Sequence, residues 1–97
     1  MRLSELRIIA YVFKVFFREG IGTFSDDIAH MDPYKGEIEV DSLCLKNRPE
    51  NDLMHEVFEA LRWQLDIEMK HSDMTALANG VCSVLHDNPE FTRMFLE

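Results

Sequence analysis

The chain is poor in cysteine and has no repeated or low-complexity segment. Only two cysteines occur among its 97 residues. Small secreted scaffolds are usually much denser in cysteine, so a disulfide framework is not expected. Cys44 and Cys82 are therefore predicted to be buried thiols. Because the sequence has no internal repeat or linker, residues 1–97 are predicted to form one domain.

A long apolar run is also missing. The most apolar stretch, Ile8 to Phe17, spans ten residues and contains Lys14. A membrane-spanning helix needs about 18 apolar residues or more, so no membrane span is predicted. Arg2 and Arg7 near this stretch leave an uncleaved signal peptide as an alternative. However, Arg18-Glu19 follows where a cleavage site would have small residues, and a cytoplasmic protein is the better prediction.

Basic residues are scarce outside the N-terminal segment. The net charge is −8; residues 1–22 contain four basic and two acidic residues, whereas the other 75 contain six basic and sixteen acidic ones. This charge repels phosphate backbones and anionic lipids, and it favours encounter with basic partners. We therefore expect no nucleic-acid or membrane partner. Maintenance of solubility alone would also explain the acidic residues.

The N-terminal segment is predicted to form a helix from Leu3 or Ser4 to Glu19, ended by Gly20. On such a helix the polar residues occupy one narrow stripe. The remaining apolar arc is wider than a surface helix normally buries. The helix would lie at the centre of the fold or be covered by another chain, and the second alternative is favoured. The sequence thus predicts a homodimer whose self-association residues are Ile9, Phe13, Phe16 and Phe17.

The middle of the chain has two competing interpretations. Asp32-Pro33-Tyr34-Lys35-Gly36 has turn chemistry, and the following residues 37–40 alternate as a strand does. A hairpin with its first arm within residues 23–31 is one interpretation. A short helix from Ser25 is the other. That helix could begin a helix-turn-helix, but the segment after it would present Glu37, Glu39 and Asp41 to DNA.

The C-terminal half is predicted to be helical. Asn47 can cap a helix with Pro49 in its first turn, reaching to about His71. A further helix is expected from Ser72, and Asn88-Pro89 should break the chain before a short final helix whose apolar contacts are Phe91, Met94, Phe95 and Leu96. The predicted fold class is mainly α: three main helices plus a short C-terminal helix, with a small β-hairpin between helices one and two (α+β if the hairpin is real).

A line of acidic residues around the single tryptophan is the main candidate site. Helical steps of three and four bring these residues to one side of the second predicted helix. Tryptophan often carries binding energy, and surrounding charge would select a basic partner. The alternative is an ordinary solvated face beside a packed tryptophan. We call this candidate partner-binding set the acidic ridge: Asp52, Glu56, Glu59, Trp63 and Asp66.

Metal and catalytic motifs are incomplete. His55-Glu56-Val57-Phe58-Glu59 begins like a zinc-protease helix, but that motif requires a second histidine where Glu59 stands. Asp52-x-x-His55 and Glu68-x-x-His71 have the spacing of the carboxylate–histidine pairs of di-iron bundles. These pairs would be sixteen residues apart on one helix, about 24 Å, and on different faces, so one chain could not bring them together. Cys82 and His86 have a two-ligand spacing without the further ligands of structural zinc. We therefore predict no metal, no cofactor and no catalytic residue.

These observations favour an acidic protein-binding module. It would act as an inhibitor or adaptor that docks on a basic surface of a larger protein, and a nucleic-acid enzyme is one class of target. The alternative function is a small DNA-binding transcriptional regulator with a degenerate helix-turn-helix. An enzyme is not expected, because the sequence has no glycine-rich phosphate loop and no nucleophile elbow.

Overall fold

The computed structural model describes residues 3–20, 29–42 and 48–97. Within them, four strands precede the helices: β1 (Glu5–Ile8), β2 (Tyr11–Arg18), β3 (Ala29–Asp32) and β4 (Glu37–Asp41). The helices are α1 (Pro49–Leu65), α2 (His71–Asp87), α3 (Pro89–Arg93) and the 3-10 helix η2 (Met94–Leu96). The fold class is therefore α+β, and the prediction of a mainly α fold with a hairpin between two helices was wrong.

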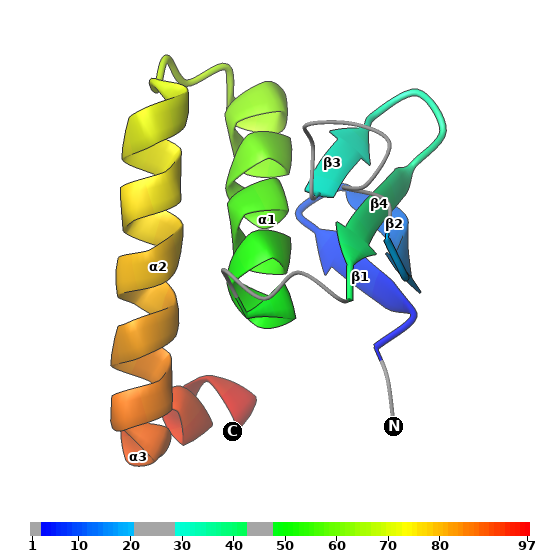
Figure 1. Cartoon of the computed structure of the whole chain (residues 1–97). Coiled ribbons are helices and arrows are strands. Elements are labelled where there is room, and N and C mark those ends of the chain that lie inside the picture. Colours follow the sequence, from blue (N-terminus) through cyan, green and yellow to red (C-terminus); the bar gives the residue numbers. More distant parts are fainter. Residues whose placement is uncertain (1–2, 21–28, 43–47) are drawn as a thin grey trace.

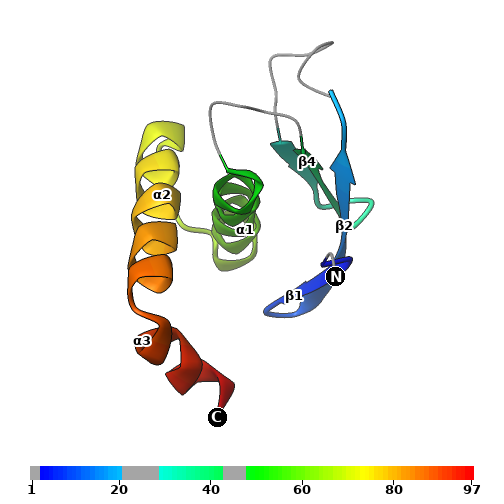
Figure 2. The ribbon, with the colours of Figure 1, turned by 60° about the horizontal axis from the view of Figure 1, so that its bottom comes forward.

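The strands form one mixed sheet in the order β1-β2-β4-β3. The two outer pairs, β1 with β2 and β3 with β4, are antiparallel, whereas the central pair of β2 and β4 is parallel. Helix α1 packs against the sheet, and α2 packs against α1. Figures 1 and 2 show the resulting layers, with α1 between the sheet and α2.

The predicted N-terminal helix is a β-hairpin. Ile8 pairs with Tyr11, so Ile9 and Ala10 form a two-residue turn between β1 and β2. Along β2, Phe13 and Val15 are buried while Val12 and Lys14 are exposed, as expected for alternating side chains. β-branched and aromatic residues fill this segment and favour a strand. The apolar arc was too wide for a surface helix because these apolar residues lie on strands of the sheet, where burial alternates from one residue to the next.

The four predicted self-association residues do not share a face. Phe13 is 1% exposed in the core, and Phe17 packs against that core. Phe16 lies under the guanidinium of Arg18, whose Cζ atom is 4.7 Å from the ring centroid. Ile9 stands exposed in the hairpin turn. The helix face that was predicted to form a homodimer is therefore not present.

The β3–β4 connection has the predicted turn. The Asp32 carboxylate accepts hydrogen bonds from the backbone N–H groups of Tyr34 and Lys35, and Gly36 N–H donates to the Asp32 carbonyl. The strand after it is also as predicted, but the hairpin is part of the sheet and does not join two helices. The competing helix from Ser25 falls mostly on residues outside the described ranges.

Gly36 and Gly80 allow a matched test of the fold. Gly36 has φ +65°, a left-handed conformation that disfavours a side chain, so Gly36→Ala should lower the free energy of unfolding by about 1 kcal/mol. Gly80 lies inside α2, where an added Cβ meets nothing within 4 Å. Gly80→Ala should raise the free energy of unfolding by about 0.5–1 kcal/mol. Urea denaturation of both variants checks the opposite signs, and equal signs would contradict this fold.

The core lies between the sheet and α1. Its fully buried members come from three strands and the middle of α1: Ile8, Phe13, Ile38, Val40 and Ala60. Leu53, Val57 and Leu61 on one side of α1 pack against them. This packing holds α1 against the sheet.

Helix α1 begins as predicted and ends earlier. Pro49 occupies its first turn, although the N-cap residue is Arg48 and not Asn47. Asp66, with φ +53°, ends the helix in the left-handed conformation, and the Ile67 N–H donates to the Arg62 carbonyl at 3.2 Å. The prediction that this helix reaches His71 was therefore wrong, and His71 is instead the first residue of α2.

Helix α2 buries Met74 and Ala78 and ends at the predicted Asn88-Pro89 break. The Thr92 hydroxyl then donates to the Leu85 carbonyl at 3.0 Å and holds α3 against the end of α2. The predicted apolar contacts of the last helix are wrong, because its apolar side chains are exposed: Phe91, Met94, Phe95 and Leu96. Within the described ranges, none of the helices is long and apolar enough to cross a membrane.

Candidate functional site

The structure splits the acidic ridge into a buried and an exposed part. Asp52 and Glu56 are buried, because α1 is the middle layer of the fold and both of these residues lie in its first half. Glu59 is partly buried, whereas Trp63 and Asp66 are exposed at the end of the helix. The five residues therefore do not present one continuous surface. Partner binding by this set stays a prediction, and its accessible part is the end of α1.

An aromatic pair lies at that end. The Tyr11 and Trp63 rings have centroids 5.3 Å apart and planes tilted by 48°. Trp63 remains 42% exposed, and Tyr11 is exposed to a similar degree. Aromatic pairs at this separation attract each other through their ring electrostatics as well as by burial. The tryptophan is therefore held in place by one neighbour while much of its surface faces solvent.

Beside the Tyr11–Trp63 pair, Gln64 of α1 makes two hydrogen bonds with the backbone of the β1–β2 hairpin. Its side-chain amide donates to the Ile8 carbonyl at 2.8 Å, and its Oε1 accepts from the Ala10 N–H at 3.2 Å. The two bonds use both ends of one amide, which fixes its orientation. The hairpin turn and the last turn of α1 are thus joined into one rigid surface.

A hollow of about 450 Å³ opens on this surface. Polar and apolar groups contribute about equally to its exposed walls, and the apolar share includes Ile9, 55% exposed, and Leu65, 51% exposed. We call the exposed apolar members of its lining the hairpin patch: Ile9, Tyr11, Trp63 and Leu65. Trp63 belonged to the predicted partner-binding set, and Ile9 belonged to the predicted self-association set. Tyr11 and Leu65 were missed, because Tyr11 comes from a predicted helix that is a hairpin and Leu65 from the predicted core stripe of α1.

Ile9 in the patch has an unfavourable backbone conformation. Its φ is +54°, which is rare for any residue with a side chain and most costly for a β-branched one. Two-residue hairpin turns with a positive φ at this position normally use glycine. Such a residue persists only where the surrounding structure holds it, and such sites cluster where a protein binds its ligands.

A second cluster joins α1 to the start of α2. His55 Nε2 and His71 Nδ1 each lie 3.9 Å from Oε1 of Glu59. The two imidazole rings are 4.6 Å apart at their centroids and meet edge to face. Burial and the neighbouring His71 lower the pKa of His55, and this exceeds the opposing effect of Glu59. This cluster was not predicted, because His71 was expected on the same helix as His55.

Cys82 and His86, the other pair with ligand spacing, have separate partners. The Cys82 thiol donates to the Glu50 carbonyl at 3.8 Å, and burial together with Glu50 raises the pKa of this thiol. His86 lies 3.3 Å from the carboxylate of the adjacent Asp87. A protonated thiol is a poor metal ligand, so these contacts do not favour a zinc site.

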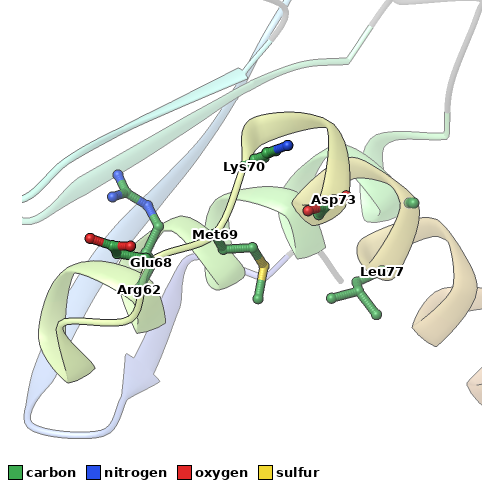
Figure 3. A pocket seen from close by; sticks show the side chains of 7 residues that line it. Arg62, Glu68, Met69, Lys70, Asp73 and Leu77 are labelled. Carbon is green, nitrogen blue, oxygen red and sulfur yellow. The ribbon is translucent and has the colours of Figure 1, made fainter.

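A wide hollow at the α1–α2 connection is shown in Figure 3. Its volume is about 880 Å³, and Arg62 and Glu68 lie close together at one side while Met69 lies in its middle. Lys70 and Asp73 complete a lining that has two basic and two acidic groups. Charges of both signs cancel one another, so the hollow does not concentrate ligands of either charge.

The chain matches no protein-family model, no curated protein and no solved structure. The functional inference therefore depends on the geometry of its own residues.

Proposed function

We propose that this chain is a protein-binding module, an inhibitor or adaptor that docks on a basic surface of a larger protein through the hairpin patch. The observation that carries the proposal is the Tyr11–Trp63 pair, which is exposed and yet fixed in place. Tryptophan and tyrosine are enriched among the residues that contribute most to protein interfaces. Because Gln64 already orders the surface, little conformational entropy would be lost on binding.

Charge supports a basic partner. The net charge of −8 produces a field that attracts a positive surface and accelerates association. Asp66 lies exposed directly after Leu65, at the edge of the hairpin patch. An apolar centre with charge at its rim is the usual arrangement of a protein interface.

The unfavourable conformation of Ile9 gives a direct test of this function. Ile9→Gly should raise the free energy of unfolding by about 0.5–1 kcal/mol, because glycine accepts a positive φ. The same change removes an apolar side chain from the hairpin patch, so it should weaken partner binding. The partner is first captured from a cell lysate on the immobilised wild-type chain, and its affinity for each variant is then measured by calorimetry.

A gain in stability together with a loss of affinity cannot result from misfolding. Val84→Ala is the matched control, because Val84 is a similarly exposed aliphatic residue on α2, outside the hairpin patch. We expect this control to bind normally. Equal affinity of wild type and Ile9→Gly for the captured protein would reject the hairpin patch as the binding surface.

The alternative of a DNA-binding regulator receives no support. The segment that would form the second helix of a helix-turn-helix is strand β4, which lies within the sheet. Its acidic residues Glu37 and Glu39 would also repel a phosphate backbone. A cytoplasmic location remains part of the proposal, and it is based on the low cysteine content of the sequence.

A further inference from the structure

Three side chains with metal-binding atoms converge where α1 and α2 meet. His55 and Glu59 are four residues apart on α1 and therefore share a face, and His71 reaches them from the first turn of α2. One ligand atom from each residue lies within 4.8 Å of the other two. Two imidazoles and one carboxylate form a donor set that zinc and other first-row transition metals use in proteins.

Thr75 fixes which nitrogen of His55 is available. Its hydroxyl lies 3.1 Å from the His71 carbonyl, which can only accept a hydrogen bond. The hydroxyl has a single proton, and when this proton is donated to the carbonyl, the 3.2 Å contact with His55 Nδ1 is made by the ring N–H. His55 Nε2 then has a free lone pair, and this is the atom that faces Glu59.

Arg62, which is not one of the three candidate ligands, forms an ion pair with Glu59. The second carboxylate oxygen of Glu59, Oε2, lies 3.3 Å from the Arg62 guanidinium, while Oε1 faces both histidines. Outer contacts of this kind orient the ligands of protein metal sites and are needed for full affinity. The cluster therefore has both a ligand set and supporting contacts.

We infer that His55, Glu59 and His71 form a binding site for a divalent transition-metal ion, with Zn²⁺ as the probe. Ligands at the usual zinc distances lie roughly 3.3 Å apart around a tetrahedron. Both histidine nitrogens lie 3.9 Å from Glu59 Oε1, and all three ligand atoms lie within 4.8 Å of one another, so the side chains must move inward to surround an ion. The His71 side chain is 79% exposed and can make that movement. Three protein ligands leave one coordination position for water or for a group of a partner. The inference is independent of the proposed protein-binding function.

The ion would connect the middle of α1 to the first turn of α2 across residues 66–70. Without a metal, the cluster joins these elements through the His71–Glu59 contact, the edge-to-face contact of the two imidazole rings and the bond between Thr75 and His55. A metal that binds only the folded state raises the free energy of unfolding, and this gain grows with the logarithm of the metal concentration divided by its Kd. The untagged full chain should therefore bind one Zn²⁺ per molecule with micromolar or tighter affinity by calorimetry, and its melting temperature should rise with the Zn²⁺ concentration.

His71→Ala is the primary variant, because this exposed side chain contributes little to packing. It should weaken Zn²⁺ binding by more than about tenfold, since the loss of outer contacts alone changes metal affinity by about 10–100-fold. His86→Ala, an exposed histidine on the same helix, is the matched control and should bind Zn²⁺ as the wild type does. Thr75→Val should weaken binding by about tenfold, because it removes the group that orients His55.

Co²⁺ provides a second readout of the ligand set. The cobalt complex should have no sulfur-to-metal charge-transfer band, because the proposed ligands are nitrogen and oxygen atoms. Absence of one-to-one Zn²⁺ binding would overturn the inference. It would also be overturned by equal affinities of wild type and His71→Ala, or by a loss of binding in His86→Ala.

Discussion

Phe13→Ala should lower the free energy of unfolding by about 3–5 kcal/mol, the usual loss when a buried phenylalanine is truncated. Phe13 is 1% exposed and lies in the centre of the core with Ile8, Ile38 and Val40. Natural domains are stable by only about 5–15 kcal/mol, so the variant should be largely destabilised. Equilibrium urea denaturation of the purified chain measures this change.

Val12→Ala is the control for this prediction. Val12 is the neighbour of Phe13 on β2, points to the opposite face of the sheet and is 46% exposed. Its truncation should cost about 1 kcal/mol or less. If Phe13 instead belonged to an interface on a helix, Phe13→Ala would dissociate a dimer while the monomer stayed folded. Light scattering beside the denaturation curve distinguishes that outcome.

The N-terminal hairpin could not be predicted from its residues because two periodicities fit them equally well. Nearly every residue from Ile8 to Phe17 is apolar or aromatic, so the pattern matches the wide face of a helix as well as a buried strand. The turn between the strands has no glycine or asparagine to indicate it. It is made by Ile9 and Ala10, and Ile9 is held at φ +54° by its surroundings.

Elements with specific local chemistry were predicted correctly. The Asp32–Gly36 turn, the start of α1 at Pro49 and the break at Asn88-Pro89 each depend on residues with restricted or special backbone behaviour. The end of α1 lacks such a residue. Asp66 adopts a left-handed conformation there without being glycine, so the sequence gives little indication that the helix stops.

Because the end of α1 was not predicted, the histidine cluster was not predicted either. On a continuous helix, His55 and His71 would lie about 24 Å apart, because each residue advances the chain by 1.5 Å. The chain instead turns back after Asp66, and the two rings come within 4.6 Å of each other. His71 of α2 therefore lies beside Glu59 and His55 of α1, an arrangement that one continuous helix could not produce.

The acidic ridge was only partly predictable for a related reason. Four of its residues lie on α1, whereas Asp66 follows the last residue of the helix, and helical periodicity does not show which sides of a helix are covered. The sheet and α2 enclose α1 as a middle layer, and Asp52 and Glu56 are buried in it. Trp63 is more exposed because it lies near the end of the helix, where the hairpin turn covers it only in part.

Trp63→Ala should weaken partner binding by about 2 kcal/mol or more, which is roughly 30-fold in affinity, as truncation of interface tryptophans does. Its cost to stability should be much smaller, about 1 kcal/mol, because the side chain is 42% exposed and its described ring contact is with Tyr11 alone. Melting of the purified variant checks the second value before any partner is known. Calorimetry with the captured partner then checks the first.

Tyr34→Ala is the matched aromatic control for that experiment. Tyr34 is 96% exposed in the β3–β4 turn and does not line the hollow of the hairpin patch, so its truncation should change neither stability nor affinity. A stability loss of about 3–5 kcal/mol in Trp63→Ala would instead identify the tryptophan as a core residue. A stable Trp63→Ala variant with wild-type affinity would exclude Trp63 as the anchor of the interface, because a tryptophan that anchors a partner cannot be removed without loss of binding energy.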